Sequence, residues 1–231
     1  MAQPIPLPFR HPSTILIAGP TGSGKTKFVV KLLTEHGIDP FPERIIWVYS
    51  EWQDLYEDVQ KELADRKPKK RIEFVKDYND DLYDSLDRTV RNLVVLDDQM
   101  VYRDMHRGGS GTGLAKFFTQ GSHHRNLTVI YIVQNLFHQA RDMRTVSLNT
   151  QYLVAFKNPR DMSQIKSLGM QMYPGNTNFL VEAYEDATKP AHGYLVIDWR
   201  ADTPEDFRIR TNVFDIETLC IYKQVRRGDG I

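Results

Sequence analysis

Cysteine, net charge and long apolar runs are the features that this sequence has little of. One of its 231 residues is a cysteine, which excludes an internal disulfide bond and favours a reducing compartment. Lysine plus arginine equals aspartate plus glutamate at 30 each, so no overall basic charge points to a nucleic-acid partner. No apolar run approaches the roughly 18 residues that a membrane span needs, and the proline-broken start lacks a signal-peptide core. We therefore expect a soluble chain that is not secreted and has no membrane partner.

Apolar runs alternate with helical patterns over residues 15–156, which is typical of βαβ units and a parallel sheet. Beyond this region two helical stretches lead into two apolar runs that are expected to pair as a hairpin. We predict one α/β domain: an N-terminal arm (1–13), a core (14–161), and C-terminal helices with a hairpin (162–231). The expected strands are 14–18, 44–49, 72–75, 93–96, 128–133, 152–156, 194–197 and 207–213, and the expected helices are 25–35, 55–63, 114–120, 162–172 and 177–188.

One eight-residue run matches the phosphate-binding pattern G-x-x-x-x-G-K-[ST] at every defined position. Glycines let its backbone curl so that successive N–H groups point at phosphate oxygens, in front of a helix N-terminus. Lys25 is expected to contact the β- and γ-phosphates of ATP, and the Thr26 hydroxyl to bind Mg²⁺. The run also lies between an expected strand and an expected helix, which favours a nucleotide-binding loop over an ordinary glycine-rich turn. This run, termed the phosphate loop, comprises Gly19, Pro20, Thr21, Gly22, Ser23, Gly24, Lys25 and Thr26.

Polar side chains follow two of the expected strands directly. Asp97 and Asp98 come after the run 93–96, and Gln134 follows the run 128–133. Ligands of open α/β sheets bind at the carboxyl ends of strands. Asp97 is predicted to hold Mg²⁺, Asp98 to orient or deprotonate the attacking water, and Gln134 to face the γ-phosphate or that water. A strand that simply enters a solvated turn also carries such residues, and that alternative stays open.

Arginines near the run 128–133 raise the question of catalysis between subunits. Arg125 precedes this run, and in a ring of subunits an arginine there can stabilise transition-state charge on a neighbour's ATP. Arg141, Arg144 and Arg160 are the alternatives. A single arginine is more often a solvated surface residue, so each of the four also has that simpler interpretation.

The order of phosphate loop, paired aspartates, Arg125 and Gln134 resembles the FtsK/HerA-like branch of P-loop ATPases. The segments His123–Asn135 and Tyr152–Asp161 are most similar to the poxvirus-type genome-packaging ATPases, which also occur in Polinton-like elements and adomaviruses. The resemblance covers roughly residues 14–161. It implies a RecA-like P-loop NTPase with a central, mostly parallel sheet flanked by helices, and with a C-terminal antiparallel hairpin.

The resemblance also implies roles for individual residues. Lys25 matches the phosphate-binding lysine, Asp98 the catalytic acid, Gln134 the sensor glutamine and Arg125 the arginine that acts in trans in related motors. Thr26 and Asp97 match the metal-binding pair. Many relatives carry glutamate at the position of Asp98, a side chain that is one methylene longer.

The function that the resemblance implies is packaging of a viral double-stranded DNA genome into a capsid, driven by hydrolysis of ATP with Mg²⁺. Capsid or portal-vertex proteins would be partners, and the chain would form a homo-oligomeric ring in the host nucleus or viral factory, or in the virion. Two alternatives stay open. A P-loop nucleotide or metabolite kinase would transfer phosphate to a small acceptor, and a non-hydrolysing assembly factor would bind ATP without turnover.

Overall fold

The computed structural model describes residues 7–65, 71–77, 81–97, 116–121, 125–136 and 141–224. The strands are β1 (Phe9–Arg10), β2 (Thr14–Ala18), β3 (Ile38–Asp39), β4 (Arg44–Tyr49), β5 (Arg71–Lys76), β6 (Asn92–Leu96), β7 (Leu127–Val133), β8 (Tyr152–Phe156), β9 (Tyr194–Asp198), β10 (Ile209–Thr211) and β11 (Cys220–Ile221). The helices are α1 (Lys25–Thr34), α2 (Leu55–Ala64), α3 (Asp81–Asp84), the π-helix η2 (Phe117–Gly121), α7 (Arg141–Leu148), the 3₁₀-helix η3 (Pro159–Asp161), α8 (Met162–Met172), α9 (Asn178–Ala187) and the 3₁₀-helix η4 (Glu205–Phe207).

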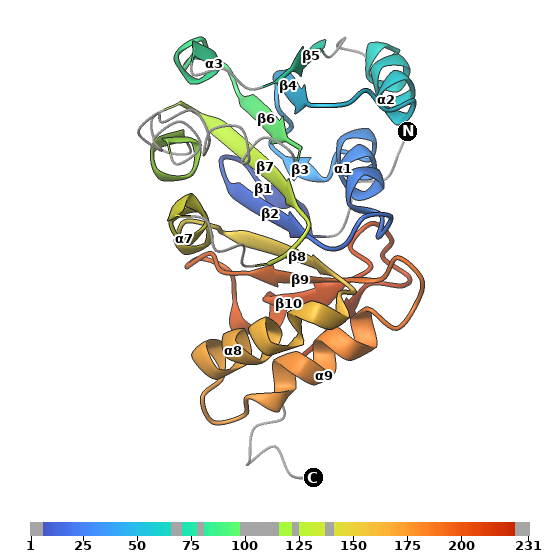
Figure 1. Ribbon diagram of the computed structural model, residues 1–231, viewed down its shortest axis with the longest axis vertical. Coiled ribbons are helices and arrows are strands. Elements are labelled where there is room, and N and C mark those ends of the chain that lie inside the picture. The colour runs from blue at the N-terminus through green and yellow to red at the C-terminus, as the bar shows by residue number, and fades with distance from the viewer. Residues whose placement is uncertain are drawn as a thin grey trace.

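A nine-stranded sheet forms the centre of the molecule, in the order β5-β4-β6-β7-β2-β8-β9-β10-β11 (Figure 1). The six neighbouring strands β5, β4, β6, β7, β2 and β8 pair in parallel. The strands β9, β10 and β11 continue the sheet in antiparallel pairing. The predicted α/β fold with a mostly parallel sheet is therefore confirmed, and so is the antiparallel pairing of β9 with β10.

The parallel strands are apolar on both faces because helices cover both faces. Every residue of β2, β6, β7 and β8 is buried. One core cluster packs α1 and α2 against one face, and the other packs α3, η2, α7, α8 and α9 against the opposite face (Figure 1). The result is a three-layer α/β/α arrangement whose two cores are separated by the sheet.

Register fixes which loops meet at one edge of this sheet. β7 lies between β2 and β6, with Ala18 opposite Val133 and Leu96 opposite Tyr131. The loops that follow β2, β6 and β7 therefore emerge side by side. We call the edge formed by these carboxyl ends the carboxyl edge, and the opposite edge, where the same strands begin, the amino edge.

Several elements were not predicted from the sequence. The short strands β1 and β3 pair in a separate two-stranded sheet, and β11 adds an edge strand. Two residues each are too few for a periodic pattern, so the sequence gives no signal for them. The helix expected over 114–120 is in part outside the described residues, and its described part includes the π-helix η2. Within the described ranges no helix is both long enough and apolar enough to cross a bilayer.

Candidate functional site

The phosphate loop curls tightly between β2 and α1. Gly22 has φ of 79° and Gly24 of 105°, the left-handed region that residues with a side chain rarely adopt, so glycine is favoured at these two positions. Gly24 is also the N-cap of α1, which begins at Lys25. The Gly19 amide donates to the Val133 carbonyl over 3.2 Å, which joins the loop to the end of β7. The loop therefore has the strand-to-helix context that the sequence predicts.

Lys25 lies inside this loop with its ammonium group directed at the loop backbone. Its side chain is buried at 9% exposure, and Nζ donates to the carbonyl oxygens of Gly19 and Pro20 over 2.5 and 3.0 Å. Burying an ammonium group is costly unless acceptors surround it. The loop thus holds a positive charge where a phosphate group would meet the N-terminus of α1.

A cavity of about 650 Å³ at the carboxyl edge brings the predicted residues together. Thr26 of the phosphate loop, Asp97 after β6 and Gln134 after β7 all line it. Because β7 lies between β2 and β6 in the sheet, Gln134 lies between the phosphate loop and Asp97. Asp98 lies outside the described residues, so its predicted role as base stays a prediction.

The carboxylate of Asp97 has a buried partner that the sequence did not indicate. The hydroxyl of Tyr56, on α2, donates to Oδ2 of Asp97 over 2.9 Å, and the Tyr56 side chain is fully buried. Its ring stacks on Phe74 with centroids 5.3 Å apart and packs against Trp47. Burial, and then the negative charge of Asp97, raise the pKa of Tyr56, so the hydroxyl remains a proton donor. This bond orients one carboxylate oxygen of Asp97.

The donor set at this edge fits Mg²⁺ bound together with a polyphosphate. Mg²⁺ usually takes one or two protein oxygens and completes its shell with phosphate oxygens and water. The Thr26 hydroxyl and the Asp97 carboxylate line the same cavity and are oxygen donors of this kind. The described residues contain no group of three or more histidine, cysteine or acidic side chains that would form an all-protein metal cage.

A second loop of the cavity wall was also missed from the sequence. Residues 50–54, between β4 and α2, line the cavity together with the first residue of α2, and Trp52 within this loop is 45% exposed. His192 reaches the cavity from the turn before β9, with Nδ1 3.1 Å from the Ser23 carbonyl oxygen. Nδ1 donates in this contact because a carbonyl only accepts. A separation of 169 residues leaves no local sequence signal for this pairing.

A buried acid, Asp161, supports the loop that carries Gln134. Asp161 is 3% exposed and accepts from the Leu136 amide over 3.3 Å and from Nδ2 of Asn158 over 2.9 Å. Burial raises the pKa of its carboxyl group. These bonds join the segment after β8 to the segment after β7, two residues beyond Gln134, and so restrict where the amide of Gln134 can lie.

Arg125 lies at the amino edge, away from the cavity of its own chain. Its guanidinium contacts Asp84 at 3.1 Å, donates to the Leu86 carbonyl at 3.3 Å, and lies 4.9 Å from the ring centroid of Tyr83. The side chain is 15% exposed. Any contribution of Arg125 to catalysis must therefore be made to another subunit, and that role stays a prediction.

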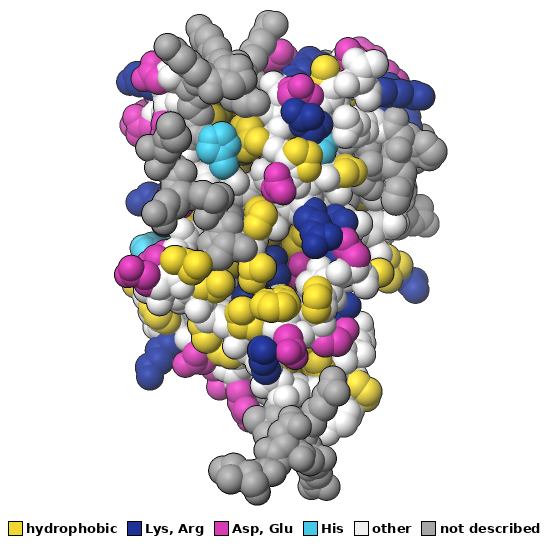
Figure 2. Space-filling view, turned by 180° about the vertical axis from the view of Figure 1, so that it is seen from behind, with side chains coloured by type: hydrophobic (Ala, Val, Ile, Leu, Met, Phe, Trp, Pro, Cys, Tyr) yellow, Lys and Arg dark blue, Asp and Glu magenta, His cyan; other side chains and the backbone are white. Residues whose placement is uncertain are grey.

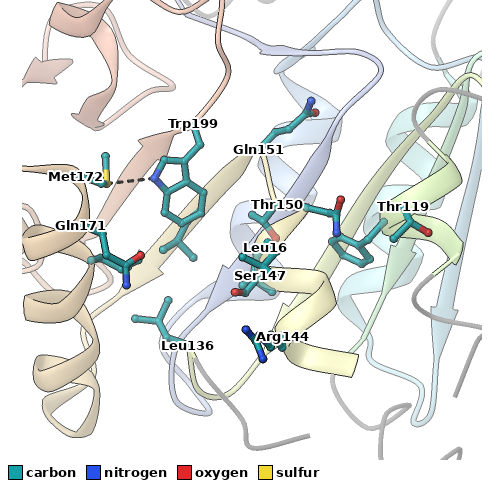
Figure 3. Close-up of a pocket in the computed structure, with 15 residues that line it drawn as sticks. Leu16, Thr119, Leu136, Arg144, Ser147, Thr150, Gln151, Gln171, Met172 and Trp199 are labelled. Carbon is teal, nitrogen blue, oxygen red and sulfur yellow. Dashed lines mark hydrogen bonds between the residues drawn. The ribbon is translucent and has the colours of Figure 1, made fainter. Parts of the chain in front are cut away.

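Two of the alternative arginines have described positions. Arg160 is exposed in η3 and follows β8 on the carboxyl edge. Arg144, on α7, lines a separate cavity of about 590 Å³ between α7, α8 and the sheet, on the face opposite α1 (Figure 3). Trp199 also lines this cavity and donates to the sulfur of Met172 over 3.1 Å. Arg144 is the one charged residue in its described lining, so no described residue there supplies an acid beside a metal-bound phosphate.

Comparisons with known proteins concern the fold of the chain. A family model for the NB-ARC domain matches residues 9–109, less than half of the chain, and this stretch includes the phosphate loop and Asp97. No curated protein matches the sequence.

Among solved structures, B204, described as the DNA-packaging ATPase from Sulfolobus turreted icosahedral virus, has a TM-score of 0.53 at 13% identity and covers 93% of this chain and 98% of its own. The chain has the fold of a P-loop NTPase. The genome-packaging NTPase B204 from Sulfolobus turreted icosahedral virus 2 gives 0.51 at 13% identity in complex with ATP-gammaS, covering 93% of this chain and 98% of B204. Its sulfate complex gives 0.52 at 14% identity, covering 93% and 97%. At such identities the likeness shows the fold.

Proposed function

We propose that this P-loop NTPase is an ATP-hydrolysing DNA translocase that packages a viral double-stranded DNA genome into a capsid. The observation that carries the hydrolytic part is the shared cavity of the phosphate loop, Asp97 and Gln134. Each of the three follows a different strand, and the sheet order holds them side by side. This is the placement needed to bind a triphosphate, its Mg²⁺ and an attacking water.

Each side chain has a distinct task in the proposed reaction. Lys25 binds the β- and γ-phosphates and offsets the charge that develops on them. Thr26 and Asp97 would hold Mg²⁺, which would supply positive charge to offset the charge of the phosphates. Gln134 orients the water, and Asp98 accepts its proton. Arg125 acts on the ATP of a neighbouring subunit.

The DNA-packaging part of the proposal rests on the fold likeness and on the sequence resemblance. The likeness to B204 covers 93% of this chain, so it extends past the nucleotide-binding core of residues 14–161. B204 is described as a DNA-packaging ATPase, and the resemblance of residues 14–161 leads to the same class independently.

The charge of a single chain does not by itself favour DNA binding, so we assign DNA binding to an assembly. The formal net charge is zero, and acidic and basic side chains are interspersed over the face shown in Figure 2. DNA affinity rises with the number of phosphates that a protein neutralises. A homo-oligomeric ring would repeat any basic side chains that face its pore in every copy, and so would concentrate positive charge there although each chain is neutral overall.

The test is ATP turnover of the purified chain with and without double-stranded DNA, measured alongside the mass of the assembly. We expect turnover in a multi-subunit assembly and stimulation by DNA. Turnover that requires a small-molecule phosphate acceptor would indicate a kinase instead. Tight ATP binding without turnover, with or without DNA, would indicate an assembly factor.

A further inference from the structure

A second cavity, of about 410 Å³, adjoins the cavity of the phosphate loop. Gly24, Lys27 and His192 line both, so the two cavities lie side by side at these residues. His192 marks the junction, since its Nδ1 lies 3.1 Å from the Ser23 carbonyl oxygen. In Figure 1 the C-terminal loops, in orange and red, lie beside the phosphate loop. A ligand with its phosphates in the loop can therefore extend into the second cavity.

Aromatic rings form much of the wall of this second cavity. Phe28 and Phe156 are buried at 4% and 3% exposure, while Tyr194 and Phe214 are half-buried. Phe28 packs edge-to-face against both half-buried rings, with centroids 4.8 Å from Tyr194 and 5.0 Å from Phe214. The buried pair thus supports two rings that keep part of their surface open.

Hydrogen bonds hold Phe214 in place although it lies in an exposed loop. The Val213 amide donates to the Tyr194 hydroxyl over 3.1 Å, next to Phe214. On the other side, Oδ2 of Asp215 accepts from the Thr218 hydroxyl over 3.1 Å. These bonds restrain the loop on both sides of Phe214, and the edge-to-face contact with Phe28 restrains its ring, so the ring loses little conformational freedom when a ligand binds to it.

We propose that this aromatic cavity binds the base and ribose of the nucleotide whose triphosphate occupies the phosphate loop. Aromatic side chains bind bases by stacking, and the cavity volume lies within the range of about 300–1,000 Å³ usual for small-molecule sites. Its exposed rim carries Asn212, Asp215 and Thr218, whose polar groups can pair with the edge of a base.

The path from phosphate to base follows the first turn of α1. Lys25 and Thr26 line the cavity of the phosphate loop, and the next two residues, Lys27 and Phe28, line the aromatic cavity. His192 at the junction is then placed against the ribose. This inference rests on the proposed nucleotide-binding function and adds which residues recognise the organic half of the nucleotide.

The test compares Phe214→Ala with the wild type for binding of ATP and of inorganic tripolyphosphate, which lacks base and ribose. Stacking on an aromatic side chain is worth about 1–3 kcal/mol per base, so ATP affinity should fall by about 5- to 150-fold. Affinity for tripolyphosphate should stay within about two-fold. Phe214→Leu, which retains apolar packing against Phe28, should also weaken ATP binding because it loses the ring face.

Phe207→Ala is the matched control. Phe207 is likewise a partly exposed ring, at 37% exposure. Each ring also has a lysine nearby: Nζ of Lys223 lies 5.9 Å from the centroid of Phe207, and Nζ of Lys31 lies 4.9 Å from the centroid of Phe214. It lines neither cavity. Its loss should change neither affinity.

Different results would overturn the base site and the nucleotide-binding function. Wild-type ATP affinity in both Phe214 variants, with the wild type binding ATP, would overturn the aromatic cavity as the base site and leave the nucleotide-binding function intact. Equal losses for ATP and tripolyphosphate would also overturn it. A wild-type chain that binds neither ligand would overturn the proposed function as well.

Discussion

The two edges of the central sheet use polar side chains in opposite ways. At the carboxyl edge, Asp97 and Gln134 line an open cavity of about 650 Å³. At the amino edge, polar side chains bind one another: Nδ1 of His11 lies 2.8 Å from the Thr128 hydroxyl, and Nε2 lies 2.9 Å from Oδ1 of Asn126. The carboxyl edge is therefore arranged for a ligand, and the amino edge for stability.

Asn92, at the start of β6, is another polar side chain of the amino edge that bonds to the protein itself. The side chain is fully buried, and its amide group donates to the carbonyls of Asp87, Val90 and Arg125 over 2.7, 3.0 and 3.2 Å. A buried amide is costly unless its donors are paired. This comparison predicts that substitutions at the carboxyl edge alter turnover with little change in stability, and that those at the amino edge do the reverse.

Lys25→Ala should give the largest effect at the carboxyl edge. Removal of the ammonium group abolishes ATP hydrolysis and weakens ATP binding by at least about 10- to 100-fold, since a hydrogen bond to a charged group is worth about 1.5–3 kcal/mol. Titration calorimetry and phosphate release measure both. Lys61→Ala, at an exposed position on α2, is the control and should behave as the wild type. Wild-type turnover in Lys25→Ala would remove the phosphate loop from the site.

Arg125→Ala challenges the comparison, because the sequence assigns a catalytic role to a residue of the amino edge. An arginine that acts in trans is worth about 10³ to 10⁵ in rate, so turnover should collapse while ATP binding persists. Mixing the variant with Lys25→Ala should restore some turnover, because an intact loop then meets an intact arginine.

Asp84→Ala separates catalysis from folding in that experiment. It breaks the same 3.1 Å contact but keeps the guanidinium, and Asp84 is 70% exposed. Normal turnover in Asp84→Ala, with collapse in Arg125→Ala, supports the trans role. Equal losses in both, without rescue on mixing, would assign Arg125 to stability alone.

The paired aspartates should separate binding from chemistry. Asp97→Asn loses a charge beside Mg²⁺ and should weaken Mg²⁺-dependent ATP binding as well as turnover. Asp98→Asn should leave binding nearly intact and cut turnover by about 10² or more, because an amide cannot accept the proton of water. Identical affinities and rates in the two variants would contradict this division.

The sequence predicts those parts of the molecule whose signal is local. The strand 44–49 and the helix 162–172 have the bounds expected from their apolar patterns, since periodicity is a property of neighbouring residues. The phosphate loop is likewise continuous in sequence, and its position between β2 and α1 is confirmed.

Contacts between distant segments could not be predicted. The bond between Tyr56 and Asp97 spans 41 residues, and it depends on β4 lying next to β6, which no local pattern specifies. The contact of His192 with Ser23 depends on the antiparallel strand β9 returning beside β8. The engagement of Arg125 with Asp84 was missed for the same reason.

Tyr56→Phe tests one of these long-range contacts and should give a smaller effect. The hydroxyl that orients Asp97 is lost, so we expect about a 10-fold higher Mg²⁺ requirement for turnover. Tyr49→Phe is the control, because the Tyr49 ring belongs to the same aromatic cluster, with its centroid 5.9 Å from that of Tyr56. It should leave the Mg²⁺ requirement for turnover unchanged. An unchanged Mg²⁺ dependence in Tyr56→Phe would show that the bond does not act on the metal site.

His11 should give the smallest effect, and only on stability. Burial lowers the pKa of His11 despite its bond to Asn126, so the fold favours the neutral ring. Its contribution is therefore present above the unfolded pKa of about 6.5 and is lost as pH falls through the folded value. Melting temperatures between pH 7.5 and 5 should fall for the wild type and fall less for His11→Gln. Parallel curves would contradict the assignment.

The most direct test of the carboxyl edge as an ATPase site is phosphate release from Mg-ATP by the wild-type assembly. Lys25→Ala, prepared identically, gives the background of any contaminating ATPase. We predict steady turnover above this background that stops when EDTA removes Mg²⁺. A rate equal to that of Lys25→Ala, or one unaffected by EDTA, would contradict the central claim.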